Sequence, residues 1–547
     1  MKTKKRKSEI RNQKSTICNS SISLCMIVKN EKENLPRCLN SIKDYVDEII
    51  IVDTGSTDRT VEIANDFGAK VFIHPWEGDF SKARNYSLKY ATCDWILILD
   101  ADHELEKADA HKLSETVKDK EANYIFFRVY DTYKESKNLA VYDFGLLFRN
   151  HLGFHYCGIV HNALISTGAI IKKSNIRIYH HGYNLSEEKM DEKFSRTSTL
   201  LKKQIETDPQ NPVPHMYLGV SNMDRRMYDD AIANSKRAIS LSEGNGFNKN
   251  DFLVSYYIVS AAYFEMKEFK ESEIYALKSV ELDSSYLDGY CLLAFAYYNL
   301  KEYDKFIEAS EKYMNIFNNI TNSDTPEKKS PLPQLNENDE AETGSPLTVV
   351  YHTIGHKWKI HLLRGVSYLS NNQNEFGNSE VDKAISESTD MEDTLMLLGN
   401  FYYENNNFDK AEDTYRKLLD INKNAVNALF NLGHIRFQKG DMNETLSFWQ
   451  KSVELEPTLI DIRLLICKIN ITLRNFEDVV VDCDQLLQAL NMPRATTIES
   501  LNDLANIFNS ISNNLKEGDD EQSAETAYRI CEDLNRLETI DTSCASI

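Results

Sequence analysis

The chain has 547 residues, 41% hydrophobic and 27% charged, which is an ordinary globular composition with length for about three or four domains. Its formal net charge of −21 argues against a general nucleic-acid binder, because phosphate contacts need a basic face. No apolar run approaches the roughly 18 residues that span a bilayer, and the ten Cys are scattered without paired spacing. We therefore expect a cytoplasmic protein without a transmembrane segment.

Residues 1–20 differ in composition from the rest of the chain. The opening stretch MKTKKRKSEIRNQK holds seven Lys/Arg and a single Glu. Such a charge run predicts a disordered basic tail, with a localisation or anionic-surface signal as the alternative.

Residues 21–196 alternate short apolar strands with helices. The strands are expected at ISLCMIV (22–28), EIIIVD (48–53), KVFIH (70–74) and WILILD (95–100). Continuous apolar strands separated by helices predict an α/β domain with a mostly parallel, Rossmann-like sheet covered on both faces. In such sheets ligands bind beyond the carboxyl ends of the strands.

Polar side chains follow these strand ends. Asn30 follows the first strand and Asp53 ends the second, while Asp58 is expected to cap the next helix. Asp100 and Asp102 follow WILIL, and residues two apart on a strand share a face, so their carboxylates suit Mg²⁺ or Mn²⁺. The alternative is a capped loop whose Asp side chains bond backbone N–H groups.

Residues 197–317 and 347–535 show helices only, with a period of 34 residues. Gly399 and Gly433 occupy the same place in successive copies, and the helix–turn–helix pattern is the tetratricopeptide signature of an all-α solenoid. Residues 318–346 interrupt the array with a polar, Pro-containing stretch that we predict to be a disordered insertion. A second Asp-x-Asp, Asp482 and Asp484, falls inside a repeat helix, so we interpret it as a solvated helix face.

The ordered motifs of residues 21–185 resemble the GT-A nucleotide-sugar-binding domain of family 2 glycosyltransferases. These motifs are Asn30-Glu31, Asp53-x-x-Ser56-x-Asp58, Arg84-Asn85 and Asp100-Ala-Asp102. Together with the repeats, the later HHGY (180–183) is similar to the bacteriocin S-glycosyltransferase branch, which modifies a peptide cysteine, and to enzymes that glucosylate surface saccharides.

The resemblance implies a set of contacts to a nucleotide-sugar donor. Asp53 would accept a hydrogen bond from the base, with uracil expected, and Glu31 would contact base or ribose, with Asn30 nearby. Arg84 would reach the nucleotide or its diphosphate, and Asp100 would hold the ribose or a metal-bound water. The alternatives are a turn-capping role for Asp53, simple capping for Glu31 and a surface salt bridge for Arg84.

The resemblance also implies the metal and the catalytic residues. Asp102 would ligate Mn²⁺ or Mg²⁺ directly, with His180 as a further ligand, and His161 would lie in the acceptor site. Related sequences often have Glu where this chain has Asn162, and an amide is not a general base. Glu104 or His161 would then take the acceptor proton, and the base stays unassigned.

The sequence therefore predicts a metal-dependent, inverting glycosyltransferase. It would move a sugar from a nucleotide-sugar, with a UDP-sugar expected, to a peptide, protein or saccharide acceptor. The repeats would bind that acceptor or a protein partner, or mediate self-association. The alternative is a catalytically degenerate sugar-nucleotide domain on a repeat scaffold. A nucleotidylyltransferase is a weaker third hypothesis. Such an enzyme would need a Gly-rich, basic phosphate-binding loop near the first strand, and the sequence has none there.

Overall fold

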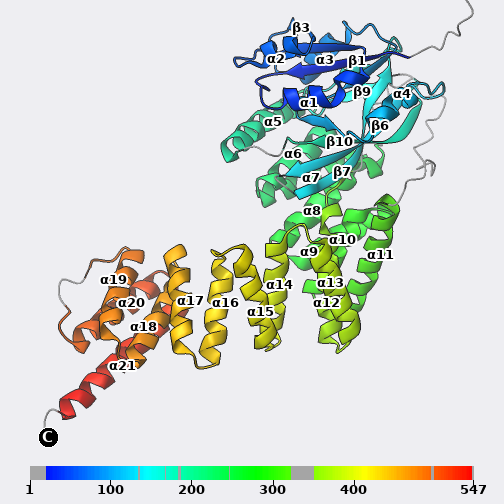
Figure 1. Cartoon of the computed structure of the whole chain (residues 1–547). Helices are drawn as coiled ribbons and strands as arrows, with labels where there is room; N and C mark the ends of the chain where they lie inside the picture. Colours follow the sequence, from blue (N-terminus) through cyan, green and yellow to red (C-terminus); the bar gives the residue numbers. More distant parts are fainter. Residues whose placement is uncertain are drawn as a thin grey trace, which may run out of the picture. The chain divides into compact units, whose positions relative to one another are not determined.

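The computed structural model describes residues 20–133, 136–166, 168–182, 186–244, 247–321, 350–494 and 498–544. Nearly all of the predicted basic tail, and the predicted insertion from residue 322 onward, lie outside the described residues. The chain divides into two compact units, one up to Thr389 and one from Asp390 onward. Figure 1 shows a sheet domain followed by paired helices.

The first unit contains one large sheet in the order β3-β2-β1-β4-β7-β6-β10-β5. The strands in that order are β3 (Lys70–Ile73), β2 (Glu48–Asp53), β1 (Ile22–Val28), β4 (Trp95–Ile98), β7 (Ser136–Arg149), β6 (Tyr124–Tyr133), β10 (Ile171–His180) and β5 (His103–Leu105). The first four are parallel to one another, and β7 is antiparallel to both of its neighbours β4 and β6. The predicted α/β fold class is confirmed, and the parallel strands are those expected from the apolar runs.

Apolar burial explains why these runs form strands. Every residue of β4 is buried, as are all but one of β1, and helix α1 (Leu35–Ile42) closes one face with four buried apolar side chains. Helices α2 (Thr60–Asp66) and α3 (Phe80–Leu88) follow β2 and β3. The register Val28↔Asp53 brings the ends of β1 and β2 to the same edge of the sheet.

A helical array follows the sheet domain. In the first unit it comprises α5 (Glu187–Thr207), α6 (Pro212–Asp224), α7 (Tyr228–Gly244), α8 (Leu253–Glu265), α9 (Phe269–Leu282), α10 (Leu287–Asn299), α11 (Tyr303–Thr321), α12 (Lys357–Ser370) and α13 (Asn374–Glu387). Helix α11 extends to Thr321, so the first four residues of the predicted insertion, 318–321, are helical instead.

In the described residues of the second unit, the regular elements are all helices: α14 (Met391–Glu404), α15 (Phe408–Ile421), α16 (Val426–Gln438), α17 (Met442–Leu455), α18 (Ile460–Thr472), α19 (Phe476–Ala489), α20 (Leu501–Glu517) and α21 (Glu521–Cys544). Close packing explains its 34-residue period. A Cβ at Gly399 would lie 2.5 Å from Tyr415, and one at Gly433 would lie 2.2 Å from Trp449, so these two copies each need a glycine opposite a large aromatic side chain. The helical repeats are confirmed, and α21 runs beyond the predicted end at residue 535.

The repeats of the first unit are attached to the sheet by a short strand, β11 (Val350–Tyr351), which pairs antiparallel with β7. Next to it, the fully buried Asp288 of α10 accepts N–H groups from His352 and Thr353, each at 2.9 Å. A buried carboxylate with these charge-assisted hydrogen bonds fixes the segment that follows the undescribed residues.

The second Asp-x-Asp lies on a helix, as predicted. Asp482 of α19 accepts a hydrogen bond from Asn470 at 2.9 Å, while Asp484 faces Arg494 at 3.4 Å. The two carboxylates therefore serve separate local contacts.

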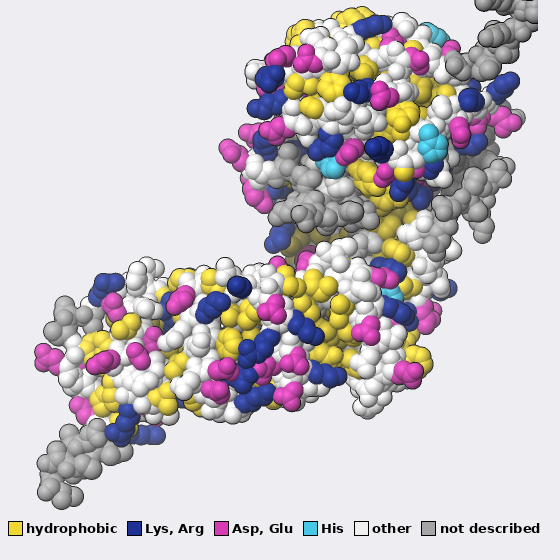
Figure 2. Space-filling model, in the orientation of Figure 1, with side chains coloured by type: hydrophobic (Ala, Val, Ile, Leu, Met, Phe, Trp, Pro, Cys, Tyr) yellow, Lys and Arg dark blue, Asp and Glu magenta, His cyan; other side chains and the backbone are white. Residues whose placement is uncertain are grey.

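The surface carries charges of both signs. On the face shown in Figure 2, the described Lys and Arg side chains are interspersed with Asp and Glu. Among the residues that the structure describes, each helix is too short or too polar to cross a lipid bilayer.

Candidate functional site

Two loops meet where β1 and β2 end, and Asn30 joins them. Asn30 has a left-handed backbone (φ +58°), which Asn tolerates better than most residues. Its N–H donates to Oγ of Ser56 at 2.9 Å, and its Oδ1 accepts the N–H of Thr57 at 2.8 Å. The side chain of Asn30 thus holds the loop after β2 in place.

Asp53 ends β2 and is 3% exposed. Its carboxylate accepts the N–H groups of Gly55 and Ser56 at 3.1 Å each, so the turn-capping contacts considered as an alternative are present. Asp58 accepts the N–H of Thr60 at 3.0 Å, which is a local turn contact just before α2, but the N-cap position itself is Arg59 and not Asp58.

Arg84 and Asp100 form an ion pair beside the end of β4. Nη2 of Arg84, on α3, lies 2.8 and 2.9 Å from the two carboxylate oxygens of Asp100. The guanidinium also lies over the Tyr156 ring, and its side chain is 15% exposed, against 41% for Asp100. The salt bridge considered as an alternative for Arg84 therefore exists, and Asp100 is its solvent-facing member.

Three potential metal ligands converge next to this pair. One ligand atom from each of Asp102, His103 and His180 lies within 4.8 Å of the others. His180 ends β10, and His103 lies directly opposite it on β5, because the two strands pair antiparallel. Oδ2 of Asp102 is 3.4 Å from Nε2 of His180. The structure thus brings together the two residues that the sequence predicted as metal ligands.

A second carboxylate orients His180. Its Nδ1 lies 2.6 Å from Oδ1 of Asp131, on the neighbouring strand β6. Burial disfavours the imidazolium, but the hydrogen bonds to Asp102 and Asp131 outweigh it and raise the pKa of His180 to about 10. Burial also disfavours the charged Asp102, yet His180 holds the pKa of Asp102 below its usual range.

His103 has a supporting position. Its Nδ1 accepts the N–H of Asp100 at 3.2 Å, which places the ring proton of the neutral form on Nε2. Burial lowers the pKa of His103, so the ring is neutral. It fixes the backbone between β4 and β5 and packs edge-on against His180, with ring centroids 5.2 Å apart.

Negative charge is concentrated around the cluster. Burial raises the pKa of Glu31, and the nearby carboxylates of Asp102, Asp100 and Asp58 raise it further. Glu31 also accepts a hydrogen bond from Asn34 at 2.9 Å. Several carboxylates this close together favour a bound cation.

Glu104 lies on the other side of β5 from His103, because side chains alternate along a strand. Its Oε2 is 3.0 Å from Nε2 of His181 and 3.9 Å from Nε of Arg37. Glu104 is thus paired with cationic or hydrogen-bonding neighbours, away from the face that carries His180.

His161 lies on a loop that contacts the first repeat. Its ring stacks on Tyr217 of α6 with centroids 3.9 Å apart and an interplanar angle of 4°. The residue keeps solvent access, and the surrounding protein lowers its pKa, so the imidazole is neutral at pH 7. Its neighbour Asn162 has a buried Nδ2 for which the described residues offer no hydrogen-bond partner.

Comparison with known proteins assigns the sheet domain. Residues 23–179 match the profile described as glycosyl transferase family 2. The N-terminal domain is a family 2 glycosyltransferase domain. Residues 287–319 and 399–440 match tetratricopeptide profiles, so this transferase domain is followed by tetratricopeptide repeats.

Several relatives align with parts of the chain. A glycosyltransferase SunS derived from the SPbeta prophage of Bacillus subtilis is 32% identical over 197 residues, 35% of this chain and 47% of that protein. A TPR repeat-containing protein of Synechococcus elongatus is 59% identical over 86 residues, 16% of this chain and 21% of that protein. An uncharacterized glycosyltransferase of Rickettsia felis is 46% identical over 86 residues, 16% of this chain and 30% of that protein. The chain thus spans less than half the length of each of these relatives.

Sequence reasoning missed three members of the candidate site: His103, Asp131 and Gly182. A Cβ at Gly182 would lie 2.3 Å from Nε2 of His180 and 2.7 Å from Oδ2 of Asp102, so only glycine leaves room for the cluster. The HHGY motif carried this signal, because a glycine directly after two histidines suggests close approach. Asp131 had no local signal, since only strand pairing brings it to His180.

Proposed function

We propose that this chain transfers a sugar from a nucleotide-sugar donor, a UDP-sugar, to a peptide, protein or saccharide acceptor with inversion at the anomeric carbon. The observation that carries the proposal is the Asp102–His180 pair, which lies at the strand ends of a family 2 glycosyltransferase domain. This is the place where ligands of open α/β sheets bind.

The side chains around Asp102 and His180 fit a divalent cation. The Asp131 carboxylate fixes the His180 ring through Nδ1 and leaves Nε2 facing Asp102, the carboxylate–histidine arrangement common at metal sites. An imidazole beside a carboxylate suits Mn²⁺ better than Mg²⁺, which prefers oxygen ligands. When bound, the ion would act as a Lewis acid that stabilises charge on the departing diphosphate.

The donor residues surround this cluster. Asp53 would accept a hydrogen bond from the base through Oδ1, which receives only the N–H of Ser56 at 3.2 Å and has a second lone pair, whereas Oδ2 receives N–H groups from both Gly55 and Ser56. Asn30 and Glu31 would border the nucleotide. Asp100 would contact the ribose or a metal-bound water, and Arg84 would orient Asp100 through the ion pair.

His161 and Glu104 are the candidates for removing the acceptor proton. Lys193 of α5 donates to the carbonyl of Gly182 at 3.4 Å, and its charge acts on both Asp102 and His161. Because His161 is accessible and near the N-terminal turns of α5, we favour it over Glu104. The repeats would hold the acceptor or a protein partner, or mediate self-association.

Donor binding and hydrolysis test the proposal. Wild-type protein should bind UDP more tightly with Mn²⁺ than with EDTA and should hydrolyse at least one UDP-sugar slowly without acceptor. Asp102→Asn should abolish the Mn²⁺ effect, whereas Asp484→Asn, the same change in the other Asp-x-Asp, should behave as wild type.

The outcomes separate the alternatives. Binding of UDP without turnover of any sugar from a UDP- and GDP-sugar panel would support the degenerate scaffold. An unchanged Mn²⁺ effect in Asp102→Asn would refute the metal assignment only. The absence of any nucleotide binding would refute the proposed function as a whole.

A further inference from the structure

A pocket of about 580 Å³ lies on one face of α5, across from the loop that follows β3. Trp76 lines it on the loop side, and Glu192, Ser195, Arg196 and Thr199 line it from α5. Its volume lies in the range of sites for small organic ligands, roughly 300–1,000 Å³. None of the metal-cluster or candidate donor residues lines it, so the pocket is a separate site.

Trp76 provides an aromatic wall. The residue is partly exposed and packs edge-on against Phe80, with ring centroids 4.7 Å apart. The other three tryptophans, Trp95, Trp358 and Trp449, are all buried. An indole that keeps solvent access can take the apolar C–H face of a ring-shaped ligand.

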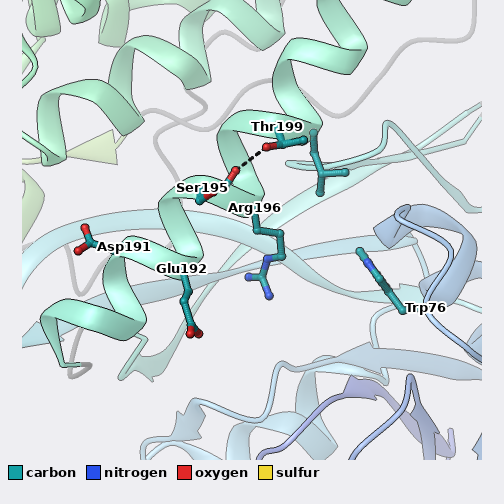
Figure 3. Close-up of a pocket in the computed structure, with 7 residues that line it drawn as sticks. Trp76, Asp191, Glu192, Ser195, Arg196 and Thr199 are labelled. Carbon is teal, nitrogen blue, oxygen red and sulfur yellow. Dashed lines mark hydrogen bonds between the residues drawn. The ribbon is translucent and has the colours of Figure 1, made fainter.

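The opposite wall carries charge of both signs. Figure 3 shows Glu192 and Arg196 extending from one side of α5, with Trp76 across the pocket from Arg196. Arg196 lies over the Phe80 ring at 5.7 Å, and within the described part of the chain neither Arg196 nor Glu192 makes an ion pair. A guanidinium only donates hydrogen bonds and a carboxylate only accepts them. A matching ligand must therefore both accept and donate.

These features discriminate between ligand classes. An apolar peptide side chain in the pocket would remove water from the guanidinium and the carboxylate. It could not form hydrogen bonds in place of those that the two groups make with water, and this loss is costly. A phosphate would pair with Arg196 but meet repulsion from Glu192. A neutral saccharide has a C–H face for Trp76 and hydroxyl groups that donate to Glu192 and accept from Arg196.

The pocket also lies close to the candidate acceptor residue. Leu200, which lines the pocket, packs into the same apolar cluster as Val160, the residue before His161. We propose that this pocket binds a neutral hexose residue of a saccharide acceptor. The assignment rests on the proposed function, since it selects the acceptor class of the same transferase.

Tryptophan fluorescence provides the test. With the other three tryptophans buried, acrylamide quenching of the full-length protein reports mainly on Trp76. The probes are the methyl glycosides of glucose, galactose and N-acetylglucosamine, titrated without any nucleotide. At least one glycoside should protect Trp76 from acrylamide, with weak, about millimolar affinity.

Variants on α5 locate the binding. Glu192→Gln and Arg196→Ala should each weaken glycoside binding about tenfold, the loss typical of removing a hydrogen bond to a charged group. Glu206→Gln makes the same charge change on the same helix, about 21 Å further along, and should bind as wild type. Both Glu variants should retain UDP binding and donor hydrolysis.

The results that overturn the assignment are distinct from failure of the proposed function. Protection of Trp76 by UDP would place the donor in the pocket, and protection by peptides but not by glycosides would replace the ligand class. No protection by any glycoside would also overturn it. Glycoside binding without any UDP binding would leave the saccharide site standing while the donor half of the proposed function fails.

Discussion

Replacing Gly182 with alanine tests the metal cluster through a residue that is not a ligand. The added methyl group would lie 2.3 Å from Nε2 of His180 and 2.7 Å from Oδ2 of Asp102, both far inside normal contact distance. The His180 ring cannot simply turn away, because Asp131 holds Nδ1 at 2.6 Å. The methyl group must therefore displace Asp102, tilt the ring or shift the backbone.

The expected magnitudes follow from this geometry. Changes to the surroundings of metal ligands typically cost about 10–100-fold in metal affinity, and we expect Gly182→Ala to fall in that range for Mn²⁺. The clashing atoms are side-chain ends, so the loss of stability should be near the low end of the roughly 1–3 kcal/mol typical of overpacking. Metal binding should therefore fail well before folding does.

The assay is an Mn²⁺ titration in the presence of UDP, monitored by calorimetry, alongside urea unfolding of the same samples. Gly244→Ala is the matched control, because its Cβ would meet nothing within 4 Å and its backbone needs no positive φ. The control should bind Mn²⁺ as wild type. Wild-type Mn²⁺ affinity in folded Gly182→Ala would refute the placement of the ion between Asp102 and His180.

Three further substitutions have defined outcomes. Asp131→Asn replaces the carboxylate that orients His180, so it should weaken Mn²⁺ binding about 10–100-fold. UDP binding measured in EDTA should stay unchanged. If calorimetry shows that Mn²⁺ binding and UDP binding weaken equally, Asp131 does not have this role. Burial favours the neutral form of Glu48, but hydrogen bonds from Lys70 and other neighbours outweigh it and lower the pKa of Glu48 from 4.5 to about 2. The ionised Glu48 therefore stabilises the folded protein above pH 4.5, and this contribution is lost as the pH falls toward 2. Glu48→Gln should thus lower the free energy of unfolding by up to about 3 kcal/mol at pH 7, measured by urea unfolding. It should also reduce the loss of stability between pH 4.5 and pH 2. An unchanged loss over that pH range would refute this role of Glu48. Asp288→Ala leaves buried N–H groups without acceptors and should lower the free energy of unfolding by at least about 3 kcal/mol. A loss below about 1 kcal/mol would contradict this, because it would show that water accepts hydrogen bonds from these N–H groups in place of the carboxylate.

The fold was predictable because its signals are local. Each parallel strand is a continuous apolar run, and such a run is stable only when helices cover both faces of the sheet. The repeat period was visible because Gly399 and Gly433 recur 34 residues apart, and each faces an aromatic side chain 16 residues further along the chain, Tyr415 and Trp449. The pairing of β11 with β7 was not predictable, since it joins residues about 200 apart without a local pattern.

The same distinction applies to the site. Asp102 was predictable because it follows a buried strand, and His180 was predictable through the resemblance. The position of His103 opposite His180 was not, because it depends on the pairing of β5 with β10. Asp131 reaches the site only because β6 lies beside β10. Strand alternation also places Glu104 on the other side of β5 from its neighbour His103, where it contacts His181 instead of His180.

The ion pair of Arg84 with Asp100 changes how the donor site is understood. The resemblance implied that Arg84 reaches the nucleotide or its diphosphate, with a salt bridge as the alternative. The Arg84 side chain is 15% exposed, and both oxygens of Asp100 accept from its Nη2. Asp100, at 41% exposure, is the member that a ligand can reach. A buried guanidinium that fixes an accessible carboxylate reduces the conformational entropy lost on binding. We therefore propose that Arg84 acts as a positioning residue and that Asp100 makes the contact with the proposed donor.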